Sequence, residues 1–554
     1  MTATLAPPRT QRTTILEYLA STDHKRIGLA TTLTAIGFFF AGGLLAILMR
    51  SELATSGLQI LSESQYNQVF TIHGSTMFYL FAVPVVLGVA LYFVPLQIGA
   101  AEIVGGRWAL MAFWMYLCGG LIMWSGFLNE FGAAPFGWSA FYPLSDSVAT
   151  PGAGTDYWFI GVVLATTAQI IQGACILATI VRLRAPGMTL MRMPLFTWSM
   201  VPTIFMVVVA FPVLVVNFIL LYLDRNAVDI FNVPGGTVTE LHLFWFYGHP
   251  VVYVVFFPLV GVVGEVIAVF SRRQFFGQKV TIISLLVFAA LSTSVWGHHM
   301  FTMQTVNNRF YSWTSTSLAV PAGVEYFGFI ATMVGGSIRL RAPMFFALGF
   351  VVLFLIGGLT GIFIGSPPLD YHVHNSYFIV AHFHYTLFGG TVFGLFAAIY
   401  YWFPKVTGRL LGETLGRWHA GLMTIGALVA FIPMFFLGHE GMPRRVANYL
   451  PRSDWDVLNI ISTVGAYIIF FSLVLFLLNV GRSLRRGRPA GPDPWEGQTL
   501  EWVTSSPPPR HNFDALPPIR GYAPLLDLRH EGKEPVAEVV RIRDELAAAA
   551  EGRP

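Results

Sequence analysis

The sequence predicts an all-α membrane protein with twelve transmembrane helices. Of its 554 residues, 55% are hydrophobic, 15% are aromatic and only 11% are charged, far below the charged share of roughly 25% in soluble proteins. Apolar runs of about 20 residues, the length that lets an α-helix cross a bilayer, recur along the chain. They cover residues 27–49, 69–95, 108–128, 157–181, 198–223, 243–270, 280–300, 316–336, 343–366, 376–403, 420–438 and 457–480.

These runs divide the chain into three segments. Residues 1–26 form a short polar N-terminal segment, residues 27–480 the twelve-helix membrane domain, and residues 481–554 a tail. The N-terminal segment lacks the apolar core and cleavage site of a signal peptide, so we expect the first helix to direct insertion. The tail is Pro-rich and then rich in Ala and Glu, which predicts a polar extension with one short terminal helix.

An even number of spans places both termini on one side of the membrane, and the basic residues indicate which side. Lys and Arg collect in the loops that share a side with the termini, and the opposite loops are mostly poor in them. The positive-inside bias therefore predicts cytoplasmic termini in a bacterial plasma membrane. The basic loop residues are Arg182, Arg184, Arg192, Arg272, Arg273, Lys279, Arg339, Arg341, Lys405, Arg409 and Arg417.

Net charge and cysteine content exclude several classes. The net charge of +4 is small and reflects orientation in a lipid membrane, so no nucleic-acid partner is expected. Cys118 and Cys175 are the two cysteines of the sequence, and they do not form a C-x-x-C pair. This excludes a c-type haem, a thiolate copper pair and a disulfide framework within this chain.

Histidines at membrane depth are the most informative residues, because a buried imidazole is costly and often marks a metal or a proton path. For any single histidine, a satisfied interhelical hydrogen bond explains the residue equally well. Six such histidines lie on four predicted helices, and isolated hydrogen bonds do not explain so many of them. They are His73, His249, His298, His299, His382 and His384.

The spacing of these histidines predicts more than one metal centre. His382 and His384 in "AHFHY" point about 200° apart on a helix, so each can serve a centre on its own side. His73 could supply the second axial ligand of one centre, giving a six-coordinate haem, while the other keeps an open face. The three imidazoles of "GHP" and "GHH" could converge on one copper ion, which suits nitrogen ligands.

A proline lies beside the first of those imidazoles, in "WFYGHPVVYVV" at 245–255. Pro250 lacks a backbone donor and should kink the helix, opening the turn in which His249 approaches its metal. Tyr253 follows four residues after His249, so its phenol should lie on the same helical face.

With these residues in place, the chain resembles subunit I of the haem-copper oxidase superfamily, to which cytochrome c oxidase belongs. The resemblance covers nearly the whole chain. It rests on "STDHKRIG" (21–28), "MRSEL" (49–53), "HPVVY", "WGHHM", "LDYHVHNSYFIVAHFHY", "GMPRR" and "TLEWVTSSPPP" (499–509).

The resemblance implies two haems, of which haem A is the expected type, and one copper ion. His73 and His384 would ligate the low-spin haem, and His382 would be the proximal ligand of the high-spin haem. The resemblance assigns the copper ion to the three remaining imidazoles, those of His249, His298 and His299.

Four further residues match functional positions of the family. Tyr253 would be covalently joined to His249 and would give an electron and a proton when the O–O bond breaks. Arg444 and Arg445, which break the charge bias of the loops, would bind haem propionates, because a guanidinium matches a carboxylate. Arg50 would face a substituent of the low-spin haem, although an arginine anchoring the helix at the membrane interface would give the same pattern.

Proton-handling positions depart from the family pattern. The relay glutamate of "HPEVY" is Val251 here, and Tyr247 resembles the tyrosine that takes over this relay in other members. The lysine of "PTGVK" is replaced by Glu325 in "PAGVE". We expect Glu325 to deliver protons to Tyr253, and a neutral structural carboxylic acid is the alternative.

Two activities fit this pattern. Nitric oxide reductases of the superfamily share glutamates near the metal and lack pumping channels, but they replace the tyrosine that this chain keeps as Tyr253. Dioxygen needs a fourth electron quickly, which Tyr253 can supply. Reduction of dioxygen to water, with proton translocation as a further expectation, is therefore favoured, and reduction of nitric oxide to nitrous oxide is the alternative.

The remaining expectations concern partners. Because this chain lacks a dicopper or c-haem motif, electrons should enter through a subunit II-type partner, with further oxidase subunits present. Cytochrome c is the expected electron donor and quinol the alternative. A transporter or haem carrier without enzymatic activity would also have twelve helices and polar residues at mid-membrane, but it would not need six histidines.

Overall fold

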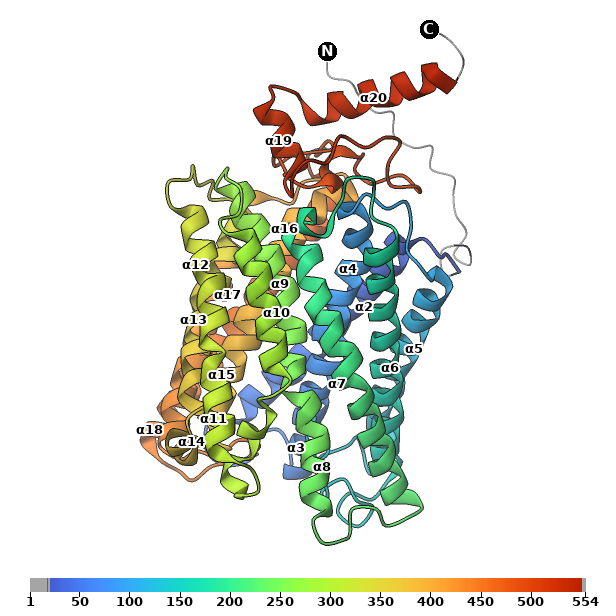
Figure 1. Ribbon diagram of the computed structural model, residues 1–554. Coiled ribbons are helices and arrows are strands. Elements are labelled where there is room, and N and C mark those ends of the chain that lie inside the picture. The colour runs from blue at the N-terminus through green and yellow to red at the C-terminus, as the bar shows by residue number, and fades with distance from the viewer. Residues whose placement is uncertain (1–16, 18–19, 551–554) are drawn as a thin grey trace.

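The computed structural model describes residue 17 and residues 20–550, and it is helical throughout its membrane domain (Figure 1). Most of the predicted N-terminal segment, residues 1–16 and 18–19, lies outside the described residues, as do the last four residues of the tail. The helices form one bundle, and the C-terminal segment lies across one end of it (Figure 1).

Within the described residues, eleven helical segments are long and apolar enough to cross a membrane, which confirms the predicted fold class. Several are built from two consecutive helices. The segments are α2 (His24–Glu52), α3–α4 (Glu63–Gln97), α5 (Gly106–Ser125), α6 (Ala153–Arg182), α7 (Leu195–Asn226), α8–α9 (Gly236–Phe270), α10 (Gln278–Ser292) with the following 3₁₀ turn η4 (Trp296–Met303), α13 (Ala342–Ile364), α15–α16 (Tyr377–Thr407), α17 (Glu413–His439) and α18 (Ser453–Arg486).

The predicted eighth span, 316–336, is the one that differs. The apolar run divides between α11 (Asn308–Ser317) and α12 (Ala319–Met333), and α12 has only 15 residues. It ends where Val334 adopts an extended conformation, ahead of Gly335 with a positive φ of 71°. The predicted eighth span is therefore a helix of 15 residues, about a turn below the usual length for crossing a bilayer.

Irregular backbone is concentrated beside the predicted ligands. The helix carrying His249 is interrupted, with α8 ending at Gly248 and α9 beginning at Pro250, as the proline predicts. Two π-helical stretches, η1 (Thr76–Ala82) and η5 (Phe388–Val392), follow soon after His73 and His384. Such stretches are often found at functional sites, because the wider turn re-aims neighbouring side chains.

Glycines set the closest helix contacts. A Cβ added at Gly119 of α5 would lie 2.6 Å from the carbonyl oxygen of Gly161 on α6, and one at Gly161 would lie 2.5 Å from that of Gly119. Small residues allow membrane helices to approach in this way. The contact brings the two helix backbones together without an intervening side chain.

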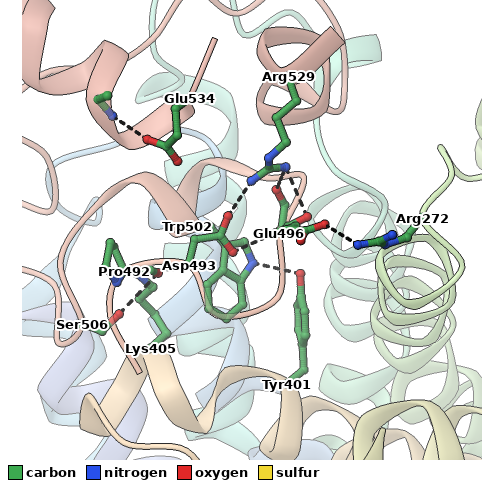
Figure 2. A network of polar contacts seen from close by, with 12 residues as sticks. Arg272, Tyr401, Lys405, Pro492, Asp493, Glu496, Trp502, Ser506, Arg529 and Glu534 are labelled. Atoms are coloured by element: carbon green, nitrogen blue, oxygen red, sulfur yellow. Dashed lines mark hydrogen bonds and ion pairs between the residues drawn. The ribbon is translucent and has the colours of Figure 1, made fainter. Parts of the chain in front are cut away.

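Residues 487–550 form a structured layer over one end of the bundle, which we term the C-terminal cap (Figure 1). It contains the 3₁₀ turn η6 (Leu500–Val503) and two helices, α19 (Pro524–His530) and α20 (Pro535–Ala550). The tail thus has a second helix beyond the one expected, because Pro524 begins a separate short helix. In Figure 2 the indole of Trp502 donates to the Tyr401 hydroxyl at 2.9 Å, and Arg529 pairs with Asp493 at 2.6 Å.

Candidate functional site

A cavity of about 1350 Å³ lies inside the bundle, and all six predicted histidines line it. Its wall is mostly apolar and includes several glycines. At two of these, Gly43 and Gly323, an added Cβ would meet no atom within 4 Å. Missing side chains at such positions leave room for a large planar group. The cavity is larger than the 300–1,000 Å³ typical of small-molecule sites, which fits more than one bound group.

Three of the histidines converge on one point of the cavity. Ligand nitrogens of His249, His298 and His299 lie within 4.8 Å of one another. His249 is only 5% exposed, and its Nε2 has no hydrogen-bond partner. A buried nitrogen without a partner beside two other imidazoles suits a metal ion, and copper accepts such a set. These residues therefore fit the copper ion that the resemblance implies.

Neighbouring side chains hold two of these rings in place. The Ser315 hydroxyl lies 2.8 Å from Nδ1 of His298, and the indole of Trp245 stacks on His299 with ring centroids 3.8 Å apart. Contacts of this kind fix the tautomer and orientation of metal ligands. Neither Ser315 nor Trp245 was among the residues predicted from the sequence.

Tyr253 lies beside this cluster as its spacing predicts. Its ring centroid is 4.8 Å from that of His249, one helical turn away on α9, and both residues line the cavity. The Glu325 carboxyl is near enough to interact electrostatically with the Tyr253 phenol. Glu325 is thus close to the tyrosine that neighbours the three-histidine cluster.

His382 and His384 contact different helices, as their spacing predicts. Nδ1 of His382 lies 3.0 Å from the Gly357 carbonyl oxygen on α13. The His384 ring stacks on Phe431 of α17 with centroids 4.7 Å apart, and its Nδ1 lies 2.8 Å from the Val380 carbonyl oxygen. In each ring Nδ1–H donates a hydrogen bond to a backbone carbonyl oxygen. Nε2 is therefore the nitrogen available to a metal.

His73 has the same arrangement on the opposite wall. Its Nδ1 lies 2.8 Å from the carbonyl oxygen of Gly42 on α2, and it is near enough to His384 for the two rings to interact electrostatically. Two imidazoles with free Nε2 atoms on facing walls fit the axial ligands of a six-coordinate haem.

Three arginines line the same cavity. Arg444 and Arg445 lie in the loop between α17 and α18, and burial together with the charge of Arg445 lowers the pKa of Arg444 to about 9, opposed by Asp370. Burial also lowers the pKa of Arg445. Two neighbouring guanidinium groups in one buried wall favour an anionic ligand, and a pair of carboxylates fits.

Arg50 is 7% exposed and donates through Nη2 to the carbonyl oxygen and side chain of Asn459 on α18. Its Nε and Nη1 have no partner. The burial of Arg50 and its contact with Asn459 favour a role inside the bundle over an anchor among lipid headgroups.

The two predicted proton-route residues lie away from the cavity surface. Tyr247 is fully buried, with its ring 4.9 Å from that of Phe211 and its hydroxyl without a partner. Glu325 is 1% exposed, and neither carboxyl oxygen has a hydrogen-bond partner. The hydroxyl of the adjacent Tyr326 donates to the Val351 carbonyl instead.

A second group of buried carboxyl groups was not predicted from the sequence. Glu265 lies on α9 and Glu501 in η6, and both are buried. Glu265 interrupts the apolar run 243–270, which is the same signal that marked Glu325. Glu501 gives no such signal, because it is located in a polar tail and is buried only by the folding of the cap.

Known proteins resemble the chain over most of its length. A family model described as "Cytochrome C and Quinol oxidase polypeptide I" matches residues 26–468. A "Putative cytochrome c oxidase subunit 1-beta" of Streptomyces coelicolor is 47% identical over 534 residues, covering 95% of this chain and 93% of that protein. "Cytochrome c oxidase subunit 1" of Corynebacterium efficiens is 45% identical, covering 92% and 89% of the two chains.

The architecture also resembles a solved structure, a heme-copper terminal oxidase dimer, with a TM-score of 0.73 over 84% of this chain and 85% of that one. The sequences of that pair are only 19% identical, so this likeness concerns the fold. The family model covers most of the chain, and the relatives are closely similar across nearly all of it. The resemblance is confirmed, and the chain belongs to the family of cytochrome c and quinol oxidase polypeptide I.

Proposed function

We propose that this chain is the catalytic subunit of a terminal respiratory oxidase that reduces dioxygen to water. The observation that carries the proposal is the arrangement of the six histidines in one cavity, three of them within 4.8 Å. When bound, a low-spin haem would carry electrons, and a high-spin haem with copper would bind and reduce the oxygen. The relatives are named as oxidases, which supports this activity over nitric oxide reduction.

The ligand roles proposed for the chain follow the geometry. His73 and His384 would hold the low-spin haem, for which haem A is the proposed type, and His382 would hold the high-spin haem. Arg50, Arg444 and Arg445 line the same cavity and would neutralise or orient haem substituents. His249, His298 and His299, whose ligand nitrogens lie within 4.8 Å of one another, would hold the copper ion.

Tyr253 is proposed to supply an electron and a proton when the O–O bond breaks. Its ring lies 4.8 Å from that of His249, so its phenol belongs to the reacting site. Glu325 interacts electrostatically with that phenol and is proposed to return a proton to it. Tyr247 is proposed as part of a second route, with its buried and unpartnered hydroxyl as the group that would pass a proton through bound water.

Electrons are proposed to come from cytochrome c through a subunit II-type partner. The chain's two cysteines, Cys118 and Cys175, are both free and lie on different helices. They cannot form the thiolate pair that an electron-entry copper site requires. Quinol is the alternative donor, and proton translocation with further oxidase subunits completes the proposal.

The proposed location is the bacterial plasma membrane with both termini in the cytoplasm. The C-terminal cap would then face the cytoplasm. Residues 27–480 would form the catalytic membrane domain, flanked by cytoplasmic segments 1–26 and 481–554. The basic loop residues lie on the cap side, and the positive-inside bias supports this orientation.

Turnover of the purified complex with each gas tests the proposal. We expect oxygen consumption with reduced cytochrome c and little nitric oxide reduction under the same conditions. Turnover of nitric oxide to nitrous oxide without oxygen consumption would instead support the alternative activity. Replacing reduced cytochrome c with a quinol in the same assay identifies the donor.

A further inference from the structure

Two buried carboxyl groups meet where the C-terminal cap packs on the bundle, outside the haem and copper cavity. Glu265 comes from α9 and is 8% exposed, and Glu501 comes from η6 and is fully buried. Glu501 directly precedes Trp502, a cap residue shown in Figure 2, in the chain.

One amide group joins the two carboxyls. Gln97 Nε2 is 2.8 Å from Oε2 of Glu265 and 3.3 Å from Oε1 of Glu501. The backbone N–H of Phe196 donates to Oε1 of Glu265 at 2.9 Å, and the indole of Trp402 donates to Oε1 of Glu501 at 3.1 Å. Three of the four oxygens therefore accept hydrogen bonds, whereas Oε2 of Glu501 has no partner.

The charged residues near Glu265 and Glu501 do not neutralise these two carboxyl groups. Lys405 interacts electrostatically with Glu501, but its ammonium group donates to three backbone carbonyl oxygens of the cap. The nearby Asp493 is matched by Arg529 at 2.6 Å. Among the described residues, neither Glu265 nor Glu501 has a cationic group within 4.0 Å. The remaining titratable neighbour is Tyr401, which interacts electrostatically with both.

Two buried carboxyl groups that share one amide and have no cationic partner should not both be ionised, because repulsion and desolvation together favour a bound proton. The hydrogen bonds indicate where the proton resides. Both oxygens of Glu265 accept from N–H donors, which suits a carboxylate. Oε2 of Glu501 accepts no hydrogen bond, so it can carry the proton.

A small cavity of about 20 Å³ lies beside Glu265. Its wall includes Glu265 and Thr499, whose hydroxyl also has no partner, and it reaches Gln498 and Tyr522 of the cap. This volume is enough for one water, since about 10–15 Å³ suffices. The polar groups of the wall provide hydrogen-bond partners for such a water on the side where the cap meets the helices.

We propose that Glu265 and Glu501 form a proton-binding site that holds one proton, carried on Oε2 of Glu501 while Glu265 remains a carboxylate. The proton is taken from solvent on the cap side through the small cavity and is returned the same way, with no bond to carbon and no electron involved. The site belongs to the interface between membrane domain and cap, separate from the histidine cavity.

Infrared spectroscopy of the assembled, cofactor-loaded complex tests this site. A protonated carboxylic acid has a C=O stretch that a carboxylate lacks, and deuterium on the acid shifts it. We expect Glu501→Gln to remove one such band from the wild-type spectrum, and Glu265→Gln to abolish or shift the same band because it removes the neighbouring charge. In the wild type the band should shift in D₂O.

Asp493→Asn is the matched control, because this buried carboxylate already has an arginine partner, and it should leave the band in place. A Glu501→Gln spectrum that keeps every acid band of the wild type would overturn the proposal. If that variant does not assemble, an unchanged band in Glu265→Gln overturns it. A band that D₂O never shifts would overturn the exchange with solvent.

Discussion

Tyr253 links the two parts of the proposed chemistry. It lies one turn from His249 on α9 and also interacts with the carboxyl of Glu325. Its phenol is therefore close to a proposed copper ligand and interacts with a buried acid. The proposed supply of an electron and a proton depends on this hydroxyl group.

Tyr253→Phe should lower oxygen turnover by at least about 10²-fold, the lower range for losing a positioned proton donor. Oxygen consumption with reduced cytochrome c measures this. Tyr385→Phe is the control, because it removes a phenol hydroxyl that is buried and without a hydrogen-bond partner and that lies on another helix. Normal turnover in Tyr253→Phe would remove the proposed role of the phenol.

The six histidines should separate by the centre that they serve. We expect His298→Ala to lose copper while keeping the low-spin haem spectrum, and His384→Ala to lose that spectrum. Metal analysis and optical spectra measure both. His419→Gln is the control, since this buried histidine contacts Tyr400 at 3.2 Å and should keep all cofactors. Wild-type turnover in a copper-free His298 variant would refute the copper assignment.

Glu325→Gln keeps the size and shape of the side chain but cannot ionise. We expect turnover to fall about 10²-fold with both haems bound, because proton transfer to Tyr253 is lost. Glu325→Lys, which restores the residue common in the family, should recover activity. Full activity of Glu325→Gln with both oxygen and nitric oxide would make the residue structural.

At the scale of helices, the apolar runs predict most spans because length and hydropathy govern insertion. The break at His249 was also predictable, since Pro250 removes a donor. The π-helical stretches after His73 and His384 have no local sequence signal. The short α12 also differs from its apolar run, which divides between α11 and α12.

The close contact between α5 and α6 can be tested with a glycine substitution. Gly119→Ala adds a Cβ that would lie 2.6 Å from the Gly161 carbonyl oxygen, so we expect destabilisation of about 1–3 kcal/mol. Thermal unfolding of the purified protein should show a lower Tm. Gly421→Ala is the control, because its Cβ would meet nothing within 4 Å. Equal Tm values for the two variants would contradict the tight α5–α6 contact.

For the whole molecule, the candidate site was largely predictable and its surroundings were not. One cavity is lined by the six histidines, Tyr253 and the three arginines. These residues could be predicted because polar side chains stand out in a largely apolar sequence. Trp245, Ser315, Glu501 and the cap contacts depend on chain segments far apart in sequence. Their roles arise only when the helices are packed, and no spacing rule reveals them.

The central claim is that one chain holds two haem sites and one copper site. The optical spectrum of the purified complex, before and after carbon monoxide is added, tests it together with copper analysis. We predict two haems and one copper per chain, with carbon monoxide binding to one haem because the other has two histidine ligands. A single haem, or two haems that both fail to bind carbon monoxide, would contradict the account.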